Sequence, residues 1–306
     1  MICIICNDEQ PASEEHIIPK AMGNKNFVTT RVCEQCNNKL GGYVDNYFTD
    51  HILIKLIRKE RNWLGESGKS IKVFPDKAKD ENTGRLFLFR NDEIVLPPDV
   101  KIDGNIMRVE ASTEEEAIKT ARKKLQRMKL SEEMIQEIIH NRDASEKMQP
   151  ITPEFKIPAD IDKGRSLLAV VKMAYEYVHL KLGDAYLENK TARDFRQELF
   201  KAIQVEYNRD VVLNYNFIMH HAQIAQNGIK ELLNYIVPLN RRMSVPIRHL
   251  IVLHNTCDNQ LVCDIFLGMI DIISFSVLVA DECPSYYPHG KVFISIIFDN
   301  DDVIDL

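Results

Sequence analysis

The sequence predicts an α+β protein in which a small N-terminal module precedes a larger mixed α+β domain. Three observations support this prediction. The first 50 residues are polar, contain two Cys-x-x-Cys pairs and hold too few apolar residues for an ordinary core. Apolar residues recur at helical spacing through much of the middle of the chain. From residue 249 onward, β-branched and aromatic runs alternate with turn residues, as in an antiparallel sheet.

The composition is that of a folded globular protein, with 45% hydrophobic and 27% charged residues among 306. This length suits one large or two medium domains. No stretch has the roughly 20 uninterrupted apolar residues of a membrane span, and the start lacks the features of a signal peptide. We therefore expect a cytoplasmic protein without a membrane partner. The formal net charge of −6 argues against a protein that coats nucleic acid nonspecifically.

Four of the seven cysteines form two pairs, Cys3/Cys6 and Cys33/Cys36, with 26 residues between the pairs. Each short turn lets two thiolates point at one ion, and two turns complete a tetrahedral zinc site without an open position. The sequence therefore predicts a structural Zn²⁺ that supplies the stability this short segment lacks. Four unrelated buried or redox-active thiols are the alternative.

We expect the first domain to span residues 1–65 and to end in a helix over residues 51–64. Charge changes sign along this domain. Residues 1–50 contain four Lys and Arg against seven Asp and Glu, whereas residues 51–72 contain six basic residues against two acids. If this domain binds a polyanion, we expect the contacts on the helix rather than on the cysteine-rich segment.

A second domain is expected over residues 66–150, with strands before helices. Thr113–Glu116 is a capping box that begins a helix reaching Met128, and a second helix follows from Ser131. The expected strands cover residues 71–74, 85–89, 93–96 and 105–111.

The third domain is expected over residues 151–306, after a proline-containing linker at residues 143–165. Two helices come first, over residues 166–182 and 192–203. The expected strands follow, over residues 211–219, 249–255, 261–268, 271–279 and 291–298.

The segments around the cysteine pairs carry further polar residues. CIIC, EHIIPKAMG and CEQCNNKLGGYVD follow one another over residues 3 to about 50, and together they resemble the HNH endonucleases in their zinc-stapled form. The resemblance implies a ββα-metal fold and the hydrolysis of DNA phosphodiester bonds with a divalent cation.

Phosphodiester hydrolysis requires an activated water and a cation on the phosphoryl oxygens. Histidine suits the first task because its pKa is near working pH, and carboxylate and amide oxygens suit Mg²⁺ or Mn²⁺. The resemblance implies that His16 is the general base and that Glu15 and Asn37 bind the catalytic ion. Adjacent strand residues point to opposite faces, so Glu15 and His16 can act together only if the strand is twisted or bulged.

The middle residue of the motif departs from the family pattern. The family often has an Asn shortly before the second cysteine pair, where it holds the loop that orients the histidine. Residues 27–32 contain none, and Asn24 and Asn26 lie slightly upstream. Asn26 is the candidate for this role, with a backbone carbonyl as the alternative.

The resemblance also implies partners. Double-stranded DNA is the expected substrate, and a homodimer would match its symmetry, since one site cuts one strand. The region from residue 70 onward is expected to choose the target, mediate assembly or bind a regulatory protein or ligand, in settings such as restriction or anti-phage defence. The expected phosphate contacts are Lys39, Lys55, Arg58, Lys59 and Arg61.

Two other functions fit the same residues. A non-catalytic zinc module would bind nucleic acid or a protein partner without cutting. An effector held inactive by its C-terminal region would cut faster as a fragment of residues 1–70 than as the full chain.

Overall fold

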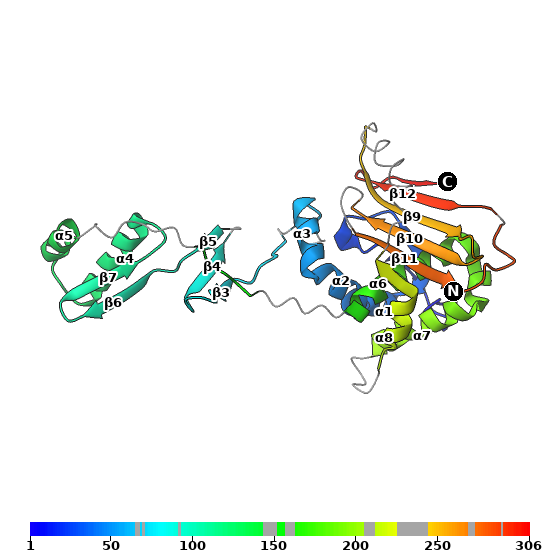
Figure 1. Cartoon of the computed structure of the whole chain (residues 1–306), viewed down its shortest axis with the longest axis horizontal. Coiled ribbons are helices and arrows are strands. Elements are labelled where there is room, and N and C mark those ends of the chain that lie inside the picture. Colours follow the sequence, from blue (N-terminus) through cyan, green and yellow to red (C-terminus); the bar gives the residue numbers. More distant parts are fainter. Residues whose placement is uncertain are drawn as a thin grey trace. The chain divides into compact units, whose positions relative to one another are not determined.

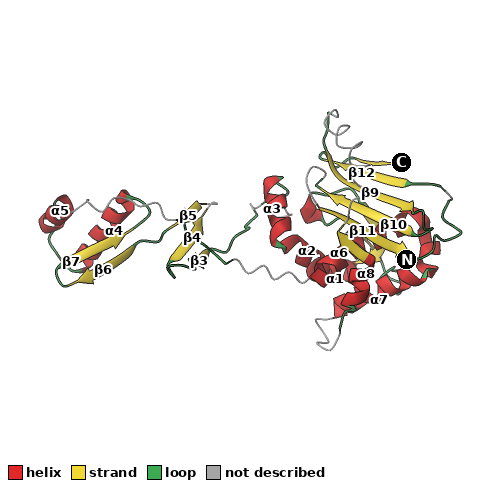
Figure 2. Ribbon diagram, viewed as in Figure 1, coloured by secondary structure: helices red, strands yellow, loops and turns green. Residues whose placement is uncertain are grey.

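The computed structural model describes residues 1–64, 68, 71–90, 93–142, 152–156, 163–204, 212–224, 244–268, 273–288 and 290–306. The fold is mixed α+β (Figure 2). The chain divides into two compact units. One contains Met1–Val73 together with Ala159–Leu306, and the other contains Phe74–Pro158. The predicted first and third domains thus share one unit, and the second is inserted between them.

The N-terminal segment is an antiparallel hairpin followed by helices. Glu15 lies opposite Thr29 and His16 opposite Val28, and a bulge interrupts the register between Ser13 and Glu15. The ββα order that the resemblance implies is therefore present. The elements are β1 (Ala12–His16), a 3-10 helix (Lys20–Met22), β2 (Val28–Cys33), α1 (Glu34–Leu40), a π-helix (Gly41–Asp45), α2 (Asn46–Asp50) and α3 (Ile52–Glu60).

The C-terminal part of the same unit combines helices with an antiparallel sheet of strand order β13-β12-β9-β10-β11-β8 (Figure 1). Four of the predicted strands correspond to β9–β12. The helices are α6 (Lys163–Leu182), α7 (Lys190–Gln204) and α8 (Tyr215–His221). The strands are β8 (Ala222–Ile224), β9 (Ile247–Asn255), β10 (Leu261–Leu267), β11 (Ile273–Ala280), β12 (Phe293–Phe298) and β13 (Val303–Asp305).

One hydrophobic core joins the hairpin to the C-terminal elements. The ring of Phe27 lies 6.0 Å from that of Tyr177 on α6. The Tyr175 hydroxyl, also on α6, donates to the Ile4 carbonyl at 2.7 Å. Helix α6 is therefore buried between the N-terminal segment and the sheet, which explains why its apolar residues cover most of its circumference.

The inserted unit contains small antiparallel sheets and two helices. Both helices begin as predicted: the Thr113 hydroxyl accepts from the Glu116 amide, and the Ser131 hydroxyl accepts from the Met134 amide. The elements are β3 (Lys77–Lys79), β4 (Leu86–Arg90), β5 (Glu93–Val95), β6 (Asp99–Asp103), β7 (Ile106–Glu110), α4 (Glu114–Arg127) and α5 (Glu132–His140).

Two predicted strands are wrong. Residues 71–74 form no strand, and the first strand of this part of the chain is Lys77–Lys79. Residues 215–221 form helix α8, whose first turn is capped by the Asn214 side chain, an acceptor for the Phe217 amide. A polar cap and packing against α6 override the strand propensity of this segment. Most of the predicted linker at residues 143–165 lies outside the described residues.

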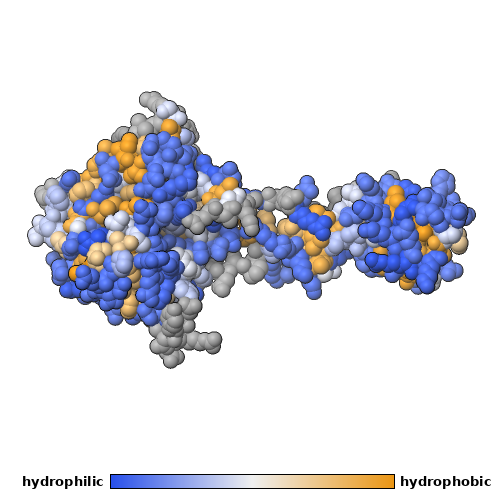
Figure 3. Space-filling view, turned by 180° about the vertical axis from the view of Figure 1, so that it is seen from behind, coloured by the Kyte–Doolittle hydropathy of each residue, from blue (hydrophilic) through white to orange (hydrophobic). Residues whose placement is uncertain are grey.

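The visible surface is mostly hydrophilic, with hydrophobic side chains gathered in limited patches (Figure 3). Among the described residues, no helix combines the length and the apolar character that crossing a bilayer requires.

Candidate functional site

The two cysteine pairs meet at one end of the hairpin. The sulfur atoms of Cys3, Cys6, Cys33 and Cys36 all lie within 4.8 Å of one another. A tetrahedral zinc ion with Zn–S bonds of about 2.3 Å places its sulfur ligands about 3.8 Å apart, so only a small contraction is needed. Within the part of the chain that the structure describes, this is the one group of three or more Cys, His, Asp or Glu side chains close enough to share an ion.

Backbone amides donate to two of these four sulfur atoms. The amides of Ile5 and Cys33 each donate to Cys3 Sγ at 3.4 Å, and the Cys36 amide donates to Cys33 Sγ at 3.5 Å. A hydrogen bond from the Cys36 side chain, together with such amides, lowers the pKa of the Cys3 thiol to about 4. The same hydrogen bond raises the pKa of Cys36, and burial raises that of Cys6 to about 11, so in the absence of an ion the negative charge concentrates on Cys3. Thiolates are the metal-binding form, and the donor set fits a structural zinc.

His16 is the last residue of β1 and is only partly exposed. Burial, followed by the charges of Lys20 and Lys172, lowers the pKa of its imidazole. The neutral ring therefore predominates at neutral pH. A neutral imidazole is the form that can accept a proton from water.

Asn37 reaches across from α1 to the strand that carries His16. Its amide nitrogen donates to the Glu14 carbonyl at 2.8 Å and to the Ser13 hydroxyl at 3.2 Å. Both acceptors lie at the bulge in β1. Because the nitrogen is engaged, the side-chain oxygen of Asn37 is the atom left to bind a cation.

Glu15 points the other way. Its carboxylate is buried and forms an ion pair with Lys172 of α6, whose ammonium also contacts Asp45 at 2.8 Å. Burial raises the pKa of Glu15 against the opposing effect of Lys172. The structure thus brings Asn37 to the strand of His16 but directs Glu15 toward the interior. A metal-binding role for Glu15 stays a prediction.

The loop between the strands is tied by Asn24, which is buried. Its nitrogen donates to the carbonyls of Ile18 at 2.8 Å and Phe27 at 3.1 Å, and its oxygen accepts from the Phe27 amide at 3.0 Å. Asn26 is exposed and instead donates to the Asp301 carbonyl at 3.0 Å. The choice of Asn26 as the loop-holding residue was wrong. The preceding Gly23, with φ of 85°, is the sequence signal for a tight turn there.

Residues 3–53 match a family model described as HNH endonuclease. The chain carries an N-terminal HNH endonuclease module. The match includes both cysteine pairs, His16 and Asn37. Comparison with curated proteins and with solved structures gave no match. The HNH module indicates nuclease activity in general and a nucleic acid substrate.

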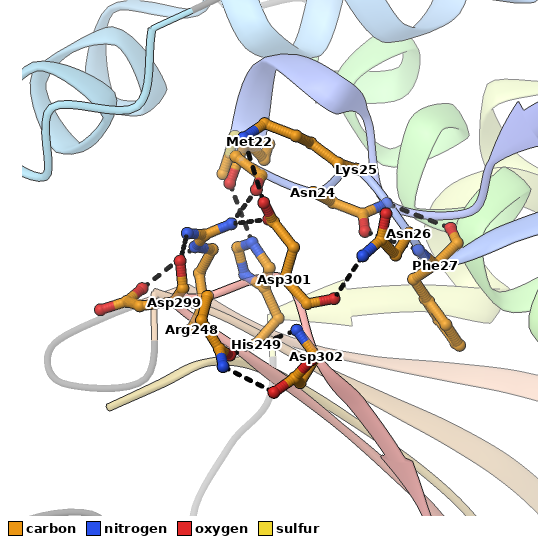
Figure 4. A network of polar contacts seen from close by, with 12 residues as sticks. Met22, Asn24, Lys25, Asn26, Phe27, Arg248, His249, Asp299, Asp301 and Asp302 are labelled. Carbon is orange, nitrogen blue, oxygen red and sulfur yellow. Dashed lines mark hydrogen bonds and ion pairs between the residues drawn. The ribbon is translucent and has the colours of Figure 1, made fainter. Parts of the chain in front are cut away.

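The far end of the HNH hairpin is held by residues near the opposite end of the chain (Figure 4). Arg248 contacts the Gly23 carbonyl and pairs with Asp301 at 2.6 Å and with Asp299 at 3.0 Å. His249 is fully buried, and burial lowers its pKa to about 3. Its Nε2 donates to the Met22 carbonyl at 2.9 Å. No local pattern marks Arg248 and His249 as partners of this loop, and the sequence did not predict these contacts.

The basic residues assigned to phosphate contact differ in their surroundings. Arg58 is buried, and its guanidinium donates to the carbonyls of Ala21 at 2.8 Å and Thr49 at 3.1 Å. Its assignment to nucleic acid does not fit this position, because its helix turns it into the HNH module. Lys55 pairs with Asp50 at 3.1 Å. Lys39, Lys59 and Arg61 are partly exposed.

Proposed function

We propose that the protein is a divalent-metal-dependent DNA endonuclease in which His16 is the general base. The observation that carries this proposal is the partly exposed His16, kept neutral beside the Asn37 contacts on a hairpin braced by four cysteines. His16 would take a proton from the water that attacks phosphorus.

Asn37, through its side-chain oxygen, and Glu15 would hold Mg²⁺ or Mn²⁺. Such an ion neutralises charge on the phosphoryl and leaving oxygens. The divalent cation also has to offset the acidic groups of the module, because residues 1–50 carry more acidic than basic residues. Glu15 can serve only if its ion pair with Lys172 rearranges, since an ammonium and a divalent cation repel each other at one carboxylate.

The substrate we propose is double-stranded DNA, with Lys39, Lys55, Lys59 and Arg61 as phosphate contacts. A homodimer would cut both strands, because one HNH site cleaves one. The C-terminal region would receive a regulatory protein or ligand, in restriction or anti-phage defence.

Relaxation of supercoiled plasmid in Mg²⁺ or Mn²⁺ tests the proposal. The wild-type chain should nick the plasmid, and His16→Ala should cut about 10²–10⁴-fold more slowly, as expected for loss of a general base. His140→Ala, at an exposed histidine in the inserted unit, is the matched control and should cut like wild type. Equal rates for His16→Ala and wild type would refute the assignment.

A second candidate function is a non-catalytic zinc module that binds nucleic acid or a protein partner. The engagement of Glu15 by Lys172 favours it, because the predicted metal ligand is then withheld. It predicts DNA retention in a gel-shift assay without any nicking, even at millimolar Mn²⁺.

A further inference from the structure

We infer that Lys172 is a positioning residue for the nuclease site, which it reaches from the C-terminal half of the chain. The inference rests on the proposed function. Lys172 lies on α6, is 0% exposed, and contacts the residues on which that function depends.

Three oxygens lie within hydrogen-bonding distance of the Lys172 ammonium, and the Glu176 carboxylate lies farther away. The three N–H groups of the ammonium match these oxygens: the Glu15 carboxylate, the Asp45 carboxylate at 2.8 Å and the His16 carbonyl at 3.2 Å. Lys172 therefore binds the backbone of the proposed base and the Asp45 side chain. The inference rests on these two contacts, because the ion pair with Glu15 has to rearrange when Glu15 binds the catalytic ion. The contact of Lys172 with Asp45 joins this strand end to the π-helix that follows α1. A shift of α6 would move His16 relative to Asn37.

This buried cluster contains one ammonium and three carboxylates, so its formal charges do not cancel. Glu176 lies 3.8 Å from the Lys172 ammonium, and neither of its buried oxygens has a hydrogen-bond partner among the residues that the structure describes; the same holds for Asp45 Oδ1. Burial raises the pKa of Glu176. Buried ions can often be replaced by well-packed apolar residues without loss of stability. A buried lysine with surplus carboxylates is thus better explained by the geometry that it imposes on His16 than by stabilisation.

The competing explanation is that Lys172 only blocks Glu15 from the catalytic ion. The two explanations predict opposite effects of removing the ammonium. Loss of a positioning contact lowers turnover, because displacement of a reacting group by about 1 Å can reduce the rate about 10²-fold. Loss of a block frees Glu15 and raises both cation affinity and turnover.

The test uses full-length Lys172→Met, which keeps the side-chain length without the charge. The control is Lys181→Met on the same helix, whose ammonium pairs with Asp305 of β13 at 2.6 Å rather than with a residue of the HNH module. Zinc content and melting temperature report folding, plasmid nicking reports kcat and KM, and EPR titration with Mn²⁺ reports cation binding independently of activity. Lys172→Met/Glu176→Gln is the second variant, because removing one charge of each sign keeps the formal charge of the cluster.

We expect Lys172→Met to keep about one zinc per chain and a KM within about threefold of wild type, with kcat lowered on the order of 10–100-fold. Lys181→Met should keep the wild-type kcat. Unchanged kcat in folded Lys172→Met, or faster cutting with tighter Mn²⁺ binding, would overturn the inference. If Lys172→Met does not fold, the double variant decides by the same criteria, and if neither folds, Lys172 is structural and the inference fails. A wild-type chain that does not cut refutes the proposed function itself.

Discussion

The two ends of the HNH hairpin are held in different ways. At one end, four cysteines between residues 3 and 36 converge through short local turns. At the other end, the loop after His16 is held by Arg248 and His249, which lie 225 and 227 residues away from their partners in sequence. The first anchor depends on spacing within one segment. The second depends on where β9 and the turn after β12 lie in the folded protein.

This difference has an energetic side. Structural zinc binding contributes about 10–16 kcal/mol of apparent free energy in zinc-finger peptides, whereas one hydrogen bond contributes about 0.5–1.5 kcal/mol net. The cysteine end should therefore dominate the stability of the hairpin. Changes of pH or of single side chains at the loop end should change the free energy of unfolding by smaller amounts.

Removing the cysteine anchor should have the largest effect. Cys33→Ser takes away a ligand that also caps α1, so we expect zinc loss and unfolding of the hairpin. Elemental analysis should fall from about one zinc per chain to none, with a lower melting temperature. Cys257→Ser, at an exposed cysteine outside the cluster, should change neither. Full zinc occupancy in Cys33→Ser would remove the basis of the comparison.

The loop anchor should weaken in acid. Burial lowers the pKa of His249 to about 3 in the folded protein, against about 6.5 when unfolded. The unfolded chain therefore binds a proton that the folded chain excludes. The contribution of neutral His249 to the free energy of unfolding is complete above pH about 6.5 and is lost as the pH falls toward about 3. The loss amounts to about 2–3 kcal/mol near pH 4.5.

The matched variant for this pH effect is His249→Gln, which keeps an N–H near the Met22 carbonyl but does not titrate. Urea unfolding from pH 7.5 to 4.5 should show a smaller loss of stability for the variant than for wild type. Parallel losses would show that His249 is not the source of the acid sensitivity.

The smallest effects should separate the two asparagines of the loop. Asn24→Ala leaves buried backbone groups without partners and should lower the free energy of unfolding by about 1–2 kcal/mol. Asn26→Ala removes one exposed hydrogen bond and should change it by less than about 0.5 kcal/mol. Chemical denaturation measures both, and a larger loss in Asn26→Ala would restore Asn26 as the loop-holding residue.

Much of the fold could be predicted where the signals are local. Thr113 and Ser131 cap their helices as expected, and β9–β12 follow the β-branched runs. Prediction failed where packing decides. Arg58 belongs to a basic helix by sequence, yet the helix face that carries it is turned into the HNH module. Asn24 and Asn26 look alike in sequence and differ only in which carbonyls surround them.

The sequence by itself determined the metal centre and the chemical type of the site. Each Cys-x-x-Cys turn brings two thiolates together by its spacing, and one hairpin joins the two turns. His16 and Asn37 were found because they follow these cysteines in the order of the motif. Only the tertiary structure decided what surrounds that site. Lys172 and His249 reach the hairpin because α6 and β9 pack against it. Burial lowers the pKa of His249 and keeps its ring neutral, whereas the carboxylates of Asp45, Glu176 and Glu15 raise the pKa of Lys172 against the effect of its burial and keep it charged. Contacts formed across a shared core depend on the whole fold, and no local spacing encodes them.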